Sequence, residues 1–273
     1  LCVPRFIQTF VMFYIISLLI CSLMVVNSED CVPVNGNRQS PININTNKVI
    51  YHWAPPLKWS YGYALTPESM ILNNTGSSLM LTVRQTEPLQ VSSGVLPVPY
   101  NFQQLHFHWG EHDQIGSEHK INGYTYPLEM HVVHSQNIRR DTDEIVVVAF
   151  FFKISPRPNS ALQSLLDTAI HLGNTTKRNE NLTSFALSHL LLDDFAYFTY
   201  KGSLTTPPYT ESVTWIISSV ELSISETQLE VLREVAKVDT RLKNNYRCLQ
   251  KIRYRPVFYI QSGVTYPYPS VFK

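Results

Sequence analysis

The sequence contains Gln104-Leu-His106-Phe-His108-Trp109 and, further along the chain, Glu129-Met-His131. Alternate side chains of a β-strand point to the same face, so Gln104, His106 and His108 share one face of a predicted strand. Glu129 and His131 have the same spacing on a second predicted strand. Three neutral histidines leave one corner of a tetrahedral zinc ion open, which is the arrangement of a catalytic rather than a structural site.

A His-x-His pair on a strand is often an ordinary surface or core pair, so its neighbours matter. Ligand histidines need their second ring nitrogen held by an acceptor. Gln104 and Glu129 each precede a histidine by two residues and lie on its face. We therefore predict that His106, His108 and His131 bind zinc, and that Gln104 and Glu129 orient them.

Runs of β-branched and aromatic residues bounded by Pro, Gly and Asn predict a large sheet. They cover Leu79 to Arg84, Gln103 to Trp109, Tyr126 to His134, Glu144 to Ile154, Ser212 to Val220 and Pro256 to Ile260. Helical periodicity gives two apolar stripes, the second opened by a capping box of Ser225 and Gln228. The stripes comprise Leu162, Leu165, Leu166, Ala169 and Ile170, and Leu229, Leu232 and Ala236. The expected fold class is α+β, dominated by sheet, with short surface helices.

The overall composition is that of a globular domain. The formal net charge is +1 and 44% of the residues are hydrophobic, which gives no electrostatic reason to expect binding to nucleic acid or to an anionic membrane. No repeat, low-complexity tract or long linker divides the chain after its first 28 residues. We expect one domain over residues 29–273.

The N-terminal residues have the pattern of a secretory signal peptide. Arg5 precedes an apolar run from Phe10 to Val26, and small residues up to Ser28 place the cleavage site before Glu29. An uncleaved membrane anchor is the alternative, because the run approaches the length of a spanning helix. Cleavage predicts a secreted, extracellular protein with no stable membrane association. The sequons that begin at Asn73, Asn174 and Asn181 agree with a secreted glycoprotein.

Several further motifs stand around the two histidine strands. They are Gln39-Ser-Pro-Ile42, His106-Phe-His-Trp-Gly110, Gly116-Ser-Glu-His119, Glu129-Met-His-Val-Val-His134 and Gly202-Ser-Leu-Thr-Thr-Pro-Pro208. In this order and spacing the blocks resemble the α-class carbonic anhydrases, of the secreted type, over roughly Cys31 to Gln261. The resemblance implies a large, mostly antiparallel twisted sheet and a zinc-dependent reversible hydration of carbon dioxide to bicarbonate and a proton. We expect a monomer whose partners are these small molecules.

The resemblance also implies roles for individual side chains. Thr205 accepts a hydrogen bond from the nucleophile on zinc and donates its own proton to Glu118, while Thr206 contacts bicarbonate at the rim. The residues that bind the substrate, including an apolar wall for carbon dioxide, are Val133, Val147, Leu204, Thr205, Thr206, Val213 and Trp215. By the same resemblance, His119 and His134 are buried structural histidines rather than ligands.

One departure from the family concerns the proton. Efficient members carry a histidine at the position that Ser77 occupies here, and a side chain with a pKa near neutrality is suited to shuttling protons. Serine does not titrate in that range. We predict an active enzyme whose turnover is limited by proton transfer.

A second departure concerns the cysteines. Secreted members pair a cysteine before the Gln-Ser-Pro-Ile block with one that follows Thr-Thr-Pro-Pro, where Tyr209 stands here. Cys31 and Cys248 remain after the leader is set aside, and an oxidising compartment favours their pairing. Two unpaired buried thiols are the alternative.

Two other functions are compatible with parts of this pattern. A catalytically silent relative of the family, serving as an extracellular binding or matrix protein, is the main alternative, although such relatives typically lack a ligand histidine. A cupin-type metal barrel leaves the Gly-Ser-Glu-His and Thr-Thr-Pro-Pro blocks unexplained.

Overall fold

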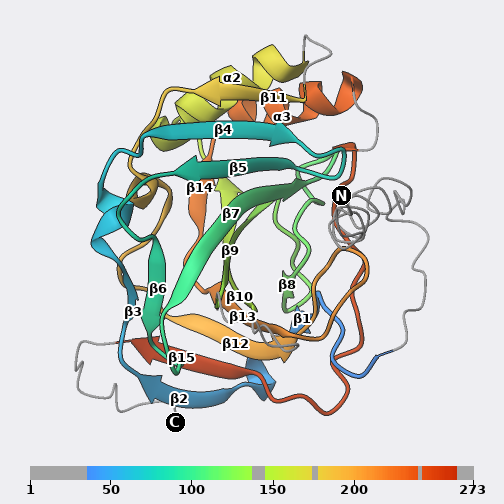
Figure 1. The fold of residues 1–273 in the computed structure, drawn as a ribbon. Helices are drawn as coiled ribbons and strands as arrows, with labels where there is room; N and C mark the ends of the chain where they lie inside the picture. The colour runs from blue at the N-terminus through green and yellow to red at the C-terminus, as the bar shows by residue number, and fades with distance from the viewer. Residues whose placement is uncertain (1–35, 137–144, 174–177, 239–241, 263–273) are drawn as a thin grey trace, which may run out of the picture.

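The computed structural model describes residues 36–136, 145–173, 178–238 and 242–262. One large sheet forms the body of this part of the chain (Figure 1), with the strand order β11-β4-β5-β7-β9-β10-β13-β12-β15-β2. β14 pairs with β10, β6 joins β3 to β7, and β1 and β8 form a separate pair. Most neighbouring strands are antiparallel, while β10 with β13, β10 with β14, β15 with β2 and β1 with β8 are parallel.

The bounds of the strands follow. They are β1 (Asn43–Ile44), β2 (Ile50–Ala54), β3 (Leu57–Trp59), β4 (Ser69–Asn74), β5 (Leu79–Arg84), β6 (Gln90–Ser93), β7 (Tyr100–Trp109), β8 (Lys120–Ile121), β9 (Leu128–Ser135), β10 (Ile145–Ile154), β11 (Asn179–Leu182), β12 (Tyr197–Gly202), β13 (Val213–Ser218), β14 (Leu222–Ile224) and β15 (Phe258–Ser262). Within the described residues, the α-helices are α2 (Gln163–Gly173) and α3 (Glu226–Val238), and short 3-10 helices cover Thr46–Lys48, Tyr61–Ala64, Ser160–Leu162 and Leu187–Leu190.

Side chains on the two faces of the central strands pack into two separate hydrophobic cores. On β10, Val146, Val148 and Phe150 belong to the larger core, which also receives the buried faces of α2 and α3. Val147 and Ala149 belong to the second core on the opposite face, with side chains from β12 and β13. This alternation follows from the two-residue period of a strand, and it explains why β10 reads as a continuous apolar run.

The helices lie together beyond β4 and β11 at one end of the sheet (Figure 1). The capping box predicted for α3 is formed: Ser225 Oγ accepts from the Gln228 amide at 3.2 Å, and Gln228 Oε1 accepts from the Ser225 amide at 3.2 Å. The prediction for α2 was wrong at Ile170, which is 44% exposed. The buried stripe continues to Leu172 instead, because it follows Leu165 and Ala169 at helical spacing.

The predicted fold class is confirmed: a large, mostly antiparallel sheet dominates, and the helices are few and short. Among the described residues no helix is both long and apolar enough to cross a membrane. The predicted leader over residues 1–28 lies outside the described residues. The single domain expected over 29–273 stays a prediction.

Candidate metal centre

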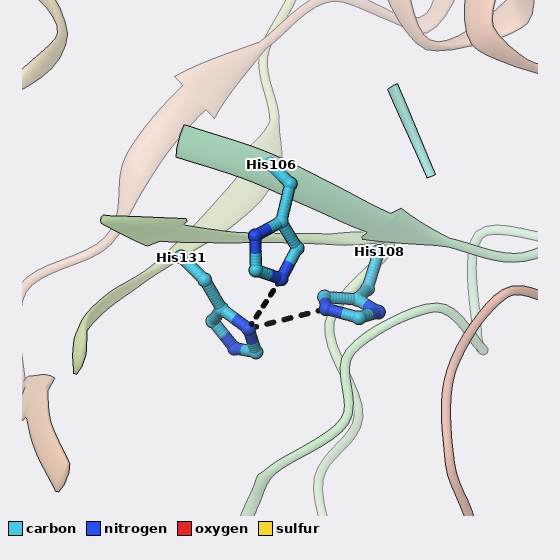
Figure 2. Close-up of side chains that lie close together, drawn as sticks. All are labelled: His106, His108 and His131. Carbon is cyan, nitrogen blue, oxygen red and sulfur yellow. Dashed lines mark hydrogen bonds between the residues drawn. The ribbon is translucent and has the colours of Figure 1, made fainter. Parts of the chain in front are cut away.

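Three imidazole rings converge between β7 and β9. The antiparallel register places His106 directly opposite His131, and His108 lies two residues further along β7 on the same face. His131 Nδ1 lies 3.1 Å from His108 Nε2 and 3.3 Å from His106 Nε2, as Figure 2 shows. Nitrogens about 2.0–2.1 Å from a tetrahedral zinc ion lie about 3.3 Å from one another. The spacing therefore fits three nitrogens on one ion.

The opposite nitrogen of each ring meets an acceptor. His106 Nδ1 lies 2.8 Å from Gln104 Oε1, and His131 Nε2 lies 2.7 Å from Glu129 Oε1. His108 Nδ1 lies 2.8 Å from the carbonyl oxygen of Asn245. Because all three partners are oxygen acceptors, each ring donates its outer N–H and turns an unprotonated nitrogen inward. Three lone pairs that face one another repel, and a cation between them removes that repulsion.

Burial keeps the His106 and His131 rings neutral. Desolvation, followed by the proximity of His108 and His131, holds the pKa of His106 well below its ordinary value. Desolvation and then His108 likewise lower the pKa of His131, although Glu129 opposes the shift. Burial alone would raise the pKa of Glu129, but His119 and His131 outweigh it and hold that pKa low. His106 and His131 are therefore held neutral, and the ionised carboxylate of Glu129 lies beside them.

Glu129 is also the centre of a buried hydrogen-bond chain. Its Oε2 accepts from the His119 amide at 2.9 Å, and its Oε1 lies 2.8 Å from His119 Nδ1. His119 Nε2 in turn lies 2.7 Å from the hydroxyl of Tyr200, which donates to Ser40 Oγ at 2.8 Å. His119, Glu129 and His131 also form a compact group of possible metal donors. Because the facing nitrogens of His119 and His131 are both engaged with Glu129, we assign this group to orientation of His131.

The backbone amide and carbonyl of Phe107, which lies between the two ligand histidines of β7, form hydrogen bonds with side chains. Ser78 Oγ donates to the Phe107 carbonyl at 2.6 Å and accepts from its amide at 3.1 Å. Asn245 Nδ2 donates to the same carbonyl at 3.0 Å, and Asn245 Oδ1 accepts from the Trp109 amide at 2.7 Å. Neither residue was predicted as part of the site. No local pattern marks them, because a distant backbone segment supplies Asn245.

Glu118 lies beside the histidines and is buried. Its Oε1 accepts from the Arg247 amide at 2.9 Å and lies 3.6 Å from His108 Nδ1. Its Oε2 lies 4.0 Å from His131 Nδ1 and meets no hydrogen-bond donor within the described part of the chain. The bond expected from Thr205 is therefore not formed in this structure, and a buried acceptor is left facing the site.

The apolar residues assigned to the substrate wall belong to one hydrophobic cluster on the His131 face. They are Val133, Val147, Leu204, Val213 and Trp215. Val147 pairs with Val133 on one side and with Trp215 on the other. The Trp215 ring lies 4.9 Å from the His131 ring. Thr205 is half-buried and Thr206 is exposed at the end of the same cluster.

Ser77 is exposed in a turn that leads into β5. The turn is closed by the Thr75 amide donating to the Ser78 carbonyl at 3.0 Å, and Gly76 adopts a φ of 82° that glycine tolerates. Just beyond it, Met80 lies opposite His106. Cys31 and Asn174 lie outside the described residues, so the pairing with Cys248 and that sequon stay predictions.

Comparison with known proteins agrees with this geometry. The family model of eukaryotic-type carbonic anhydrases matches residues 27–261. Human mitochondrial carbonic anhydrase 5A is 34% identical over 83% of this chain and 79% of its own length. Mouse carbonic anhydrase 7 is 33% identical over 81% and 88%, and rabbit carbonic anhydrase 1 is 34% identical over 73% and 87%. One of these relatives is named as mitochondrial, so the expected secreted type stays a prediction.

Proposed function

The chain belongs to the eukaryotic-type carbonic anhydrase family, and on that premise we propose that it is a zinc enzyme that converts carbon dioxide and water reversibly into bicarbonate and a proton. The observation that carries the proposal is the set of three inward, unprotonated nitrogens on His106, His108 and His131. Neutral imidazole nitrogens at this spacing suit zinc, and three of them leave a position for water.

The chemistry divides between the metal and the protein. When bound, zinc lowers the pKa of a coordinated water and so supplies hydroxide near neutral pH, a property for which carbonic anhydrases are themselves the standard example. The protein supplies an apolar surface on the His131 face, where Val147, Val213 and Trp215 are buried in one cluster. Carbon dioxide has no dipole, so such a surface favours it over water beside the metal.

Glu118 and Thr205 orient the reacting water. Glu118 Oε2 is buried without a donor among the described residues, while the Arg247 amide occupies Oε1. A buried acceptor left unpaired is costly, and a hydroxyl donor relieves that cost. We assign the donor to Thr205, which then must accept a hydrogen bond at its own oxygen. Thr206, exposed beside it, contacts bicarbonate.

The proton leaves slowly in this proposal. Ser77 is exposed in the turn before β5, and its hydroxyl lies 3.1 Å from Thr75 Oγ1. Neither hydroxyl titrates near neutral pH, so neither takes up and releases a proton at the rate that a histidine achieves. Buffer must carry the proton instead, and turnover should rise with the concentration of an imidazole-type buffer.

The cellular setting is also a proposal. The apolar N-terminal run supports a cleaved leader, a secreted monomeric domain over 29–273 and a disulfide between Cys31 and Cys248. Within the described residues, Asn181 is exposed on β11, whereas the side-chain Nδ2 of Asn73 donates to the carbonyls of Ile71 and Met80. Asn181 is therefore the better glycan acceptor of these two. Intact mass before and after deglycosylation and alkylation tests each modification.

The activity is tested by two measurements on the purified mature chain. Metal analysis should find one zinc per chain, and stopped-flow hydration of carbon dioxide should be abolished by a chelator and restored by zinc. A chain that binds zinc without accelerating hydration would support the alternative of a catalytically silent relative. A chain that binds no zinc would overturn the proposal altogether.

A further inference from the structure

Tyr209 ends the turn that carries Thr205 and Thr206, and its backbone is unusual. Its φ is 61°, in the left-handed region that a bulky side chain seldom adopts. Its amide donates to the Thr206 carbonyl at 2.9 Å, which closes the turn. A glycine or asparagine would adopt this φ more readily. An aromatic residue at this φ therefore indicates that the ring makes a stabilising contact.

The ring contacts the guanidinium of Arg247. The Cζ atom of Arg247 stands 3.8 Å from the centre of the Tyr209 ring, a close cation–π contact. Arg247 Nη1 donates to Gln39 Oε1 at 3.0 Å and to the Ser40 carbonyl at 2.5 Å. Arg247 Nη2 is buried and has no hydrogen-bond partner within the described residues. The Tyr209 ring thus contacts one face of this half-buried guanidinium, while Nη1 forms hydrogen bonds at its edge.

The backbone of the same arginine holds the catalytic carboxylate. The Arg247 amide donates to Glu118 Oε1 at 2.9 Å, which directs Oε2 toward the histidines. A second contact ties the turn to this assembly, because Gln39 Nε2 donates to the Tyr209 carbonyl at 3.1 Å. The turn with Thr205 and the carboxylate of Glu118 are therefore linked to one another through Arg247 and Gln39.

We infer that Tyr209 is a positioning residue for the proposed reaction: its stack on Arg247 fixes the Thr205 turn relative to Glu118. The inference rests on the proposed function only for its kinetic consequence. The Tyr209 ring holds the Arg247 side chain, and the Arg247 amide holds the Glu118 carboxylate. The Tyr209 amide closes the turn that follows Thr205. Loss of the ring loosens the Thr205–Glu118 pair while the zinc ligands on β7 and β9 stay in place.

The kinetic test compares Tyr209→Leu with Tyr209→Phe. Leucine removes the aromatic face, and we expect about a five- to tenfold fall in kcat/KM for hydration, the scale of a lost cation–π contact. Phenylalanine keeps the face and should retain the parent value, since no described hydrogen bond uses the phenolic oxygen. Zinc stoichiometry should be unchanged in both. Tyr254→Leu, at a fully exposed tyrosine, controls for a generic Tyr-to-Leu effect.

A double-mutant cycle separates positioning from general destabilisation. If Tyr209 acts through the Glu118 carboxylate, Tyr209→Leu should not lower kcat/KM further in an enzyme that already carries Glu118→Gln. An equal fall in both backgrounds would overturn the inference. So would parent-like kinetics of Tyr209→Leu, and that result would leave the proposed function intact.

A structural measurement tests the inference whether or not the chain hydrates carbon dioxide. Amide hydrogen exchange of the peptide over residues 203–210 should become faster in Tyr209→Leu than in Tyr209→Phe, while exchange in β7 and β9 stays the same. Equal exchange in the two variants would overturn the inference. An inactive parent enzyme would instead count against the proposed function.

Discussion

The strands that carry the three histidines and the turn that holds Ser77 are neighbours in the sheet, yet their side chains are held very differently. Each histidine is fixed by an acceptor within 2.8 Å. Ser77 is exposed, and its hydroxyl lies near another hydroxyl, that of Thr75. The two regions meet where Met80 of β5 lies opposite His106.

The difference shows that two requirements of a hydration enzyme are met separately. Holding a cation requires several donors fixed in advance, because their mutual repulsion must be sustained by the surrounding fold. Exporting a proton requires a mobile, solvent-accessible group that titrates near the working pH. The first requirement is built into β7 and β9, whereas the second is not built into the Ser77 turn.

The largest effect should follow the loss of a ligand. His106→Ala removes one of the three inward nitrogens, so zinc affinity should fall by more than the roughly 100-fold that loss of an orienting partner causes. Hydration should fall to background, as measured by stopped flow after dialysis against chelator. His112→Ala, at an exposed histidine, is the matched control and should keep one zinc per chain. Equimolar zinc in His106→Ala would refute the ligand assignment.

The next effect concerns orientation rather than binding. Glu118→Gln keeps the shape of the side chain and an oxygen for the Arg247 amide, but it replaces the unpaired acceptor Oε2 by a donor. With Thr205 no longer correctly paired, kcat/KM should fall by about 100-fold, while zinc content stays at one per chain. Glu87→Gln, at an exposed position, serves as control. An active Glu118→Gln enzyme would remove Glu118 from the mechanism.

A smaller effect should follow the loss of an orienting partner. Gln104→Ala leaves the His106 N–H without its acceptor, so zinc affinity should fall by about 10- to 100-fold. Gln103→Ala is a close control, because Gln103 is exposed in the β7 bulge one residue away. Competition with a chromophoric chelator measures both. Equal affinities in the two variants would mean that Gln104 does not orient His106.

Sequence patterns predicted those parts of the molecule that local rules govern. β5 begins and ends at the predicted residues, Leu79 and Arg84, a run of apolar and β-branched residues in which Leu79 and Leu81 are buried at the two-residue period of a strand. Gln104 and Glu129 lie beside the predicted histidines, since the strand period alone places them. β9 begins at Leu128 rather than at Tyr126, because Pro127 has no amide proton for a ladder.

No local sequence pattern predicted the contacts between distant segments. The carbonyl of Asn245 serves His108 from a segment that pattern analysis left unassigned, and any residue type offers a carbonyl. The place of β2 beside β15 depends on the order of the whole sheet. Ser78 looks like an ordinary turn serine, and its role emerges only when β5 stops short of Phe107. Residue type and spacing therefore predicted the histidines that donate to the metal, whereas the partners Asn245 and Ser78 depend on the topology of the sheet.

The smallest effect tests the other side of the comparison. Ser77→His places a titratable group in the exposed turn, so turnover in a weak, low-concentration buffer should rise several-fold, by about one order of magnitude at most. The gain should shrink as an imidazole-type buffer is added, because buffer and histidine then perform the same transfer. It should also vanish below the pKa of the new histidine, where the ring stays protonated and accepts no further proton. Ser77→Ala should match the parent at every buffer concentration, since neither side chain titrates. If Ser77→His leaves weak-buffer turnover unchanged while kcat/KM is intact, proton export is not the slow step, and the contrast between the two regions has no kinetic consequence.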